Sequence, residues 1–240
     1  MIFHYTSIET LALILESKKL RFTRLDRLDD LQEHSLYEGF KIHLSHFVSC
    51  WTENSNENVA LWKMYSDMHG VRIGLDIADI NLPRGDVPEI LKYDGFFIIP
   101  GTIIPYFQKV SYLNDIDLRE TIRATVKKEG KTITIGNNGL AVGGFKSKYW
   151  EFQNESRFVL QIISLKNGFD RGIKEMLNED MQEEWFDIPV FNTIIPTMEI
   201  TLGPLCTPAE KLIVKALIKS YEVNIELKES SLKNIIRNKA

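Results

Sequence analysis

The 240-residue sequence is poor in cysteine and has no long apolar run. Its two cysteines, Cys50 and Cys206, lie far apart, unlike the closely spaced cysteines of a secreted disulfide framework, so we expect reduced thiols. No segment approaches the roughly 20 apolar residues of a membrane helix, and Met1–Tyr5 lacks the basic and apolar regions of a secretory signal. These absences predict a cytoplasmic protein with no membrane partner.

Charge of one sign is also not in excess. The chain has 29 Lys and Arg against 33 Asp and Glu, a net charge of −4, so no global attraction to nucleic acid is expected. Apolar residues make up 44%, which is sufficient for a hydrophobic core. We expect one folded domain over residues 1–240, with an elaborated middle segment at about 78–144.

Several common catalytic motifs are missing. The glycines at 136, 139, 143 and 144 fit neither a Walker loop nor a dinucleotide-binding loop. Cys50 lies inside the apolar run Phe47–Trp51 and is expected to be inert packing. His43 and His46 are three apart on a predicted helix, but no third ligand is fixed beside them. We therefore expect no metal site and no P-loop type of phosphoryl transfer.

The apolar pattern predicts a mixed α and β protein. Period-two runs and short apolar runs indicate strands at 3–5, 20–22, 47–51, 71–75, 108–112, 155–163, 199–202 and 223–227. Start signals and helical spacing indicate helices after the capping boxes Thr6–Glu9 and Thr207–Glu210, from Asp30 through His46, over Val59–Tyr65 and over Asp115–Lys128.

Polar residues with possible chemistry lie near the first strand and the third helix. His4, Thr6 and Ser7 precede a helix N-terminus, whose free amides can bind an anion. The alternative is that Thr6 and Ser7 cap the helix and His4 is structural. Tyr65 follows the polar loop 52–58 and could stack on a flat heterocycle, although aromatics on a short helix are more often core.

The strand at 155–163 carries the third candidate group. Its alternation predicts a half-buried strand with Phe158, Leu160 and Ile162 on one face. Gln153, Glu155 and Arg157 would share the other face, where Glu155 could meet a sugar hydroxyl. The alternative is a plain surface ion pair between Glu155 and Arg157.

These residues together resemble the bacterial domain-of-unknown-function family 2971 across most of the chain. The resemblance is carried by Phe3–Ser7, Leu25–Glu33, Phe47–Trp51 with Trp62–Tyr65 and Gly70–Val71, Trp150 with Glu155 and Arg157, and Glu199–Gly203. The family's order of parts is in turn similar to that of ADP-ribosyltransferases. This implies an α+β fold with a mixed, mainly antiparallel split sheet and flanking helices.

The same resemblance implies NAD as a substrate. His4, Tyr65 and Glu155 take the three catalytic positions, with Gln153 two residues before the glutamate. Glu155 would stabilise oxocarbenium charge, Tyr65 would stack on nicotinamide, and His4 would hold the ribose or the amide. The other expected cofactor-binding residues are Thr6, Ser7, Arg157, and Arg21 or Arg24 for the pyrophosphate.

The sequence therefore predicts an ADP-ribosyltransferase or NAD glycohydrolase. The resemblance connects such an enzyme with toxins or anti-phage defence. The sequence does not identify a macromolecular acceptor. One alternative is a non-catalytic module that binds a nucleotide or a protein. A second is a metal-dependent nuclease-like effector, in which Asp29, Asp30, Glu33 and Glu155 gather a divalent ion. The transferase hypothesis requires His4, Tyr65 and Glu155 to line one pocket.

Overall fold

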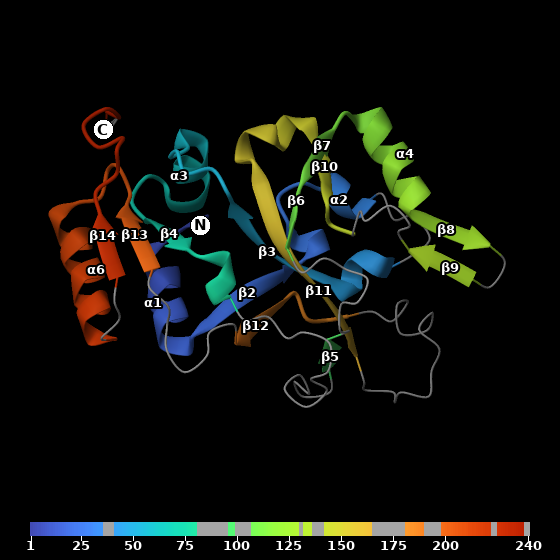
Figure 1. Ribbon diagram of the computed structural model, residues 1–240, viewed down its shortest axis with the longest axis horizontal. Helices are drawn as coiled ribbons and strands as arrows, with labels where there is room; N and C mark the ends of the chain where they lie inside the picture. Colours follow the sequence, from blue (N-terminus) through green and yellow to red (C-terminus); the bar gives the residue numbers. More distant parts are fainter. Residues whose placement is uncertain are drawn as a thin grey trace.

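The computed structural model has a ten-stranded main sheet with helices on its flanks (Figure 1). Among the described strands of this sheet only the β13–β14 pair is parallel, so the expected α+β class with a mixed, mostly antiparallel sheet is confirmed. The structure describes residues 1–35, 41–80, 96–98, 107–129, 132–135, 142–164, 181–189, 198–221 and 225–237.

Seven strands of the main sheet follow the order β12-β2-β3-β1-β4-β13-β14. β11 pairs with β3 and also with β5 and β6. Two small sheets pair β7 with β10 and β8 with β9. The strands are β1 (Ile2–Thr6), β2 (Lys19–Arg24), β3 (His46–Thr52), β4 (Val71–Leu75), β5 (Phe96–Ile98), β6 (Phe107–Lys109), β7 (Ser111–Leu113), β8 (Val126–Glu129), β9 (Thr132–Ile135), β10 (Phe145–Ser147), β11 (Glu155–Ser164), β12 (Trp185–Pro189), β13 (Met198–Leu202) and β14 (Ile225–Lys228).

The sheet splits at β3. β11 pairs with all seven residues of β3, so β1 and β2 share the opposite edge of that strand. β1 pairs there only at Thr52, whereas β2 pairs at Phe47 and Val48. The two strands diverge between these points, which leaves the middle of β3 open along that edge.

Helices cover the sheet and carry clear start signals. α1 buries Leu11, Ile14 and Leu15 in the main core, to which α6 contributes Val214. The expected Thr207 capping box with Pro208 in the first turn is present. The helices are α1 (Ile8–Ser17), α2 (Gln32–Ser35), α3 (Val59–Ser66), α4 (Asp115–Thr125) and α6 (Pro208–Ser220), with 3-10 helices η1 (Leu25–Arg27), η2 (Lys41–Ser45), η3 (Ile77–Asp79) and η4 (Lys148–Gln153).

Several predicted boundaries are wrong. The N-cap of α1 is Ser7, whose hydroxyl accepts from the Thr10 amide, because Thr6 still belongs to β1. The predicted helix through His46 is also wrong, because His46 begins β3 after the 3-10 helix η2. His43 and His46 therefore do not share a helix.

The middle segment also differs from prediction. The strand expected over 108–112 is divided into β6 and β7, and the helix expected to reach Lys128 gives way to β8 at Val126. The predicted final strand starts at Ile225 within the described residues, and positions 222–224 lie outside them. Most of the glycine-rich loop 136–144 lies outside them too.

β11 is buried on both faces and not half-buried as predicted. Leu160 and Ile162 pack in the main core, and on the other face Arg157 is fully buried and Glu155 is 5% exposed. The edges of the strand are paired with β3 on one side and with β5 and β6 on the other, and eight of its ten residues are buried. In the part of the chain that the structure describes, no helix is long and apolar enough to cross a membrane.

Candidate functional site

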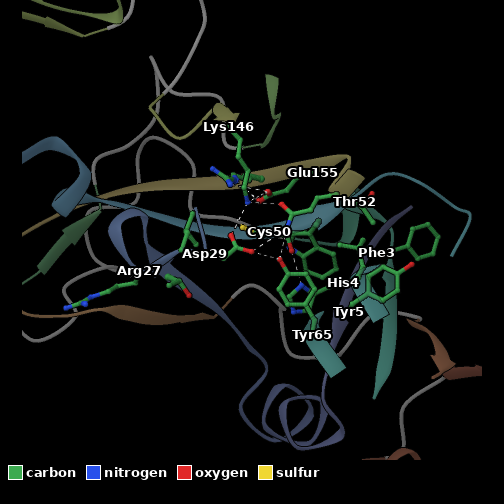
Figure 2. Close-up of a pocket in the computed structure, with 16 residues that line it drawn as sticks. Phe3, His4, Tyr5, Arg27, Asp29, Cys50, Thr52, Tyr65, Lys146 and Glu155 are labelled. Carbon is green, nitrogen blue, oxygen red and sulfur yellow. Dashed lines mark hydrogen bonds and ion pairs between the residues drawn. The ribbon is translucent and has the colours of Figure 1, made fainter. Parts of the chain in front are cut away.

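A cavity of about 320 Å³ lies where the sheet splits (Figure 2). Its walls come from the two diverging strands, the open middle of β3, the end of α3 and the start of β11. The lining residues are Phe3, His4, Tyr5, Thr23, Arg27, Leu28, Asp29, Cys50, Trp51, Thr52, Leu61, Tyr65, Lys146, Gln153, Glu155 and Arg157.

His4 occupies the split between the strands. Its Nδ1 donates a 2.9 Å hydrogen bond to the carbonyl of Cys50, which lies in the stretch of β3 left open on that edge. A carbonyl can only accept, so the proton is assigned to Nδ1 and Nε2 is left as an acceptor. Burial lowers the pKa of His4 despite the hydrogen bond to Cys50, so the ring is neutral near pH 7. The His4 ring also lies 5.2 Å from that of Trp51.

Tyr65 is positioned by α3 and by two polar neighbours. The helix begins after Asn58, whose side chain accepts from the amides of Ala60 and Leu61. The Tyr65 hydroxyl donates to Asp29 Oδ2 at 3.2 Å and accepts from Gln153 Nε2 at 3.0 Å. Burial of the hydroxyl and the nearby Asp29 carboxylate raise the pKa of Tyr65, so the phenol stays protonated. Its ring nevertheless borders solvent at the cavity mouth, with 43% of the residue exposed.

Arg157 links two buried carboxylates. Its Nε donates to Glu155 Oε1 at 2.5 Å and its Nη2 to Glu155 Oε2 at 3.1 Å. The same guanidinium holds Glu33 through Nη1 and, at 2.9 Å, through Nη2. The Glu155–Arg157 pair is therefore an interior ion pair and not the surface pair weighed from the sequence.

Lys146 lines the cavity although it was not among the residues predicted from the sequence. Its side chain is only 2% exposed, and Nζ lies 2.7 Å from Gln153 Oε1, 3.1 Å from Asp29 Oδ1 and 3.3 Å from Glu155 Oε2. Its ammonium also lies 4.8 Å from the centroid of the Trp150 ring. Burial acts to lower the pKa of Lys146, but the Glu155 and Glu33 carboxylates outweigh it and raise the pKa.

The two buried carboxyl groups are shifted in opposite directions. Burial would raise the pKa of Glu155, but Arg157 and Lys146 prevail and lower it to about 2. Burial dominates at Glu33 and raises its pKa, in spite of the Arg157 partner. Glu155 is therefore the more firmly ionised of the pair.

The structure brings together five of the predicted site residues in the cavity lining: His4, Tyr65, Gln153, Glu155 and Arg157. Gln153 reaches it from the 3-10 helix η4 and not from the strand, so the prediction that Gln153 shares a strand face with Glu155 and Arg157 is wrong. The cavity lining does not include Thr6, Ser7, Arg21 or Arg24.

The two arginines expected at a pyrophosphate are engaged elsewhere. Arg21 forms an exposed bidentate pair with Asp187, its neighbour on β12. Arg24 is buried and donates to Asp26 and to the backbone carbonyls at 181 and 183. Arg27, which the sequence reasoning did not select, is the arginine at the cavity rim, where it pairs with Glu184 at 2.6 Å.

The proposed divalent-metal set does not fit the geometry. Asp29, Glu33 and Glu155 do converge, but they converge on Lys146 Nζ, at 3.1, 3.5 and 3.3 Å. The ammonium thus fills the position that a divalent ion would need. Asp30 turns instead to the amides of Gln32 and Ser147. Among the described residues, no group of three His, Cys, Asp or Glu side chains has metal-site geometry.

Cys50 lines the cavity, but its thiol is poorly suited to be a nucleophile. Burial and the neighbouring Glu155 carboxylate raise the pKa of Cys50 well above its ordinary value. The thiol therefore stays neutral, whereas a reactive cysteine needs a thiolate.

Comparison with known proteins adds no relative. No family model matches the chain. No curated protein and no solved structure matches it either. The ADP-ribosyltransferase hypothesis therefore depends on the geometry of the cavity.

Proposed function

We propose that the cavity binds NAD and cleaves the bond between nicotinamide and ribose, either for ADP-ribosyl transfer or for hydrolysis. The observation that carries the proposal is that His4, Tyr65 and Glu155, from three distant segments, line one cavity. A packing role for these residues would not require them to meet.

The size and the walls of the cavity suit part of a dinucleotide. Small-molecule sites have volumes of about 300 to 1,000 Å³. At about 320 Å³ this cavity fits the nicotinamide and its ribose better than the whole dinucleotide, so the adenosine half would extend past the mouth. The rings of Tyr65 and Trp51 offer stacking surfaces, and Nε2 of neutral His4 can accept from the carboxamide.

The reaction requires stabilised positive charge. When the glycosidic bond breaks, its electron pair goes to the pyridinium nitrogen, which leaves neutral nicotinamide and a cationic ribose carbon. Water or an acceptor group then bonds to that carbon and loses its proton. Glu155, ionised and held by Arg157 and Lys146, places a fixed negative charge at the cavity floor.

The proposal is tested by titrating NAD into the wild type and Glu155→Gln and measuring released nicotinamide by mass spectrometry. We expect release from the wild type and at least a hundredfold slower release from Glu155→Gln, the scale of losing one electrostatic group. The exposed loop residue Glu53 supplies the control, because Glu53→Gln removes the same charge outside the cavity lining. Absence of NAD binding to the folded wild type would refute the proposal.

A second candidate function is nucleotide binding without cleavage. It is favoured by one observation: both oxygens of Glu155 already contact Arg157, and one of them also contacts Lys146. A carboxylate held in this way is suited to fixing the positions of Arg157 and Lys146, which is a structural role and not a catalytic one. Tight NAD or ADP-ribose binding with no nicotinamide release from the wild type would select this function.

A further inference from the structure

The carboxylates around Lys146 differ in their access to the cavity. Glu33 and Glu155 have side chains that are only 1% and 6% exposed, whereas the Asp29 side chain is 33% exposed. A ligand entering the cavity therefore meets Asp29 with little rearrangement, but must displace Lys146 or Arg157 to reach Glu155 directly.

The position of Asp29 is also fixed by the residues around it. One oxygen contacts Lys146 Nζ at 3.1 Å, and the other accepts from the Tyr65 hydroxyl at 3.2 Å. Figure 2 shows Asp29 between the ammonium of Lys146 and the ring of Tyr65. A carboxylate held at both oxygens and still open to solvent is preorganised to accept a further hydrogen bond from a ligand.

Building on the proposed function, we infer that Asp29, and not Glu155, is the carboxylate that contacts the ligand, by accepting a hydroxyl of the ribose bound against Tyr65. Glu155 then does not contact the ligand and is a positioning residue that holds Lys146 and Arg157. The shared Lys146 contact keeps the two carboxylates on one network, so the ligand's hydroxyl joins a chain of charge-assisted hydrogen bonds.

The test uses calorimetric titration of NAD and of ADP-ribose, which carries the ribose but no nicotinamide. Asp29→Asn removes the charge and keeps the shape, and we expect it to weaken binding of both probes by about tenfold or more. Asp29→Glu, which restores the charge one methylene away, should recover part of the loss. The control is Asp79→Asn, at an exposed aspartate that does not line the cavity, which should leave both affinities unchanged. Circular dichroism confirms that each variant is folded.

The outcomes separate this inference from the proposed function. Unchanged affinities of Asp29→Asn for NAD and ADP-ribose would overturn the inference, whether or not the wild type releases nicotinamide. Weakened ADP-ribose binding by Asp29→Asn, with no nicotinamide release from the wild type, would support the inference and overturn the cleavage. No binding of either probe by the wild type would overturn both.

Discussion

Glu33 and Arg157 form a bidentate ion pair in the protein interior although 124 positions separate them in the chain. Their side chains are 1% and 0% exposed. Because water reaches neither group, each depends on the other for its solvation, and the pair joins α2 to the centre of the sheet.

Removal of the Arg157 charge should be severely destabilising. Arg157→Met leaves two buried carboxylates, Glu33 and Glu155, with Lys146 as their one remaining described cation, so we expect a loss of about 3–5 kcal/mol in the free energy of unfolding, or failure to fold. Arg21→Met removes an equally bidentate but exposed pair with Asp187 and should cost at most about 1 kcal/mol. Urea unfolding of both variants checks this, and equal losses would contradict it.

Glu155 should contribute to stability in a pH-dependent way. Its pKa in the folded protein is about 2, below its ordinary value of 4.5, so the contribution is fully present above about pH 4.5 and is lost as the pH falls toward 2. The raised pKa of Glu33 acts in the opposite sense, because that carboxyl is easier to ionise in the unfolded chain. The difference in the free energy of unfolding between the wild type and Glu155→Gln should therefore shrink as the pH is lowered, which urea titrations measure. A difference that grew at low pH would contradict this prediction.

Ligand affinity should depend on the protonation of His4. The pKa of His4 is lowered from 6.5 by burial, so Nε2 is an available acceptor at neutral pH and becomes a donor once the ring is protonated. We expect NAD affinity to be constant between about pH 7 and 8 and to fall on acidification with a midpoint below 6.5, the ordinary pKa of histidine. In calorimetric titrations, His4→Gln should remove this loss of affinity at low pH. The same loss of affinity in the variant would show that another group is responsible for it.

Gly70 should tolerate no side chain. A Cβ there would lie 2.1 Å from the Thr6 carbonyl oxygen, which is backbone of β1 and cannot easily yield. Gly70→Ala should cost at least about 1–3 kcal/mol by this overlap, with a lower melting temperature as the readout. Gly74→Ala, four residues later and within β4, is the milder comparison, because its added Cβ would lie 3.0 to 3.2 Å from side-chain atoms only.

Asn58 should matter twice, for α3 and for the cavity. Its side chain caps α3, and its Nδ2 donates a 2.6 Å hydrogen bond to the Phe152 carbonyl. Asn58→Ala removes both interactions and should cost about 0.5–2 kcal/mol while loosening Tyr65. Asn58→Asp keeps the cap but loses the Nδ2 donor. Comparing the melting temperatures of the two variants therefore separates the contribution of the cap from that of the hydrogen bond to Phe152. Equal melting temperatures for wild type and Asn58→Ala would contradict the capping role.

Much of the sheet followed from local patterns. Val71–Leu75 was predicted at its observed bounds, and Phe47–Trp51 lies within β3, because short apolar runs bounded by turn or loop residues are typical of buried strands. The helix after Pro208 was equally visible, since its capping box is a local signal. By contrast, the segment 41–46 carried helical spacing, but pairing of His46 with Gln161 on β11 drew its end into the sheet.

The site was only partly predictable for a related reason. His4, Tyr65 and Glu155 could be proposed from resemblance, but the burial of Arg157 and Lys146 depends on carboxylates that lie far away in the sequence. Lys146 stands between Phe145 and Ser147 in a three-residue strand, where a lysine ordinarily indicates a surface position. Nothing local distinguishes a lysine that will be solvated by Asp29 and Glu155 from one solvated by water.

The split at β3 becomes a closed cavity only after a later part of the chain has been synthesised. β1, β2 and β3 emerge early, yet the floor of the cavity comes from β10, η4 and β11. Until the ribosome has released the segment that carries Lys146 and Arg157, Glu33 has no buried cation to receive it and the edge of β3 that β11 will cover has no strand beside it. A nascent chain is thus without its site, and has an open strand edge, until Arg157 has been synthesised and has left the ribosome.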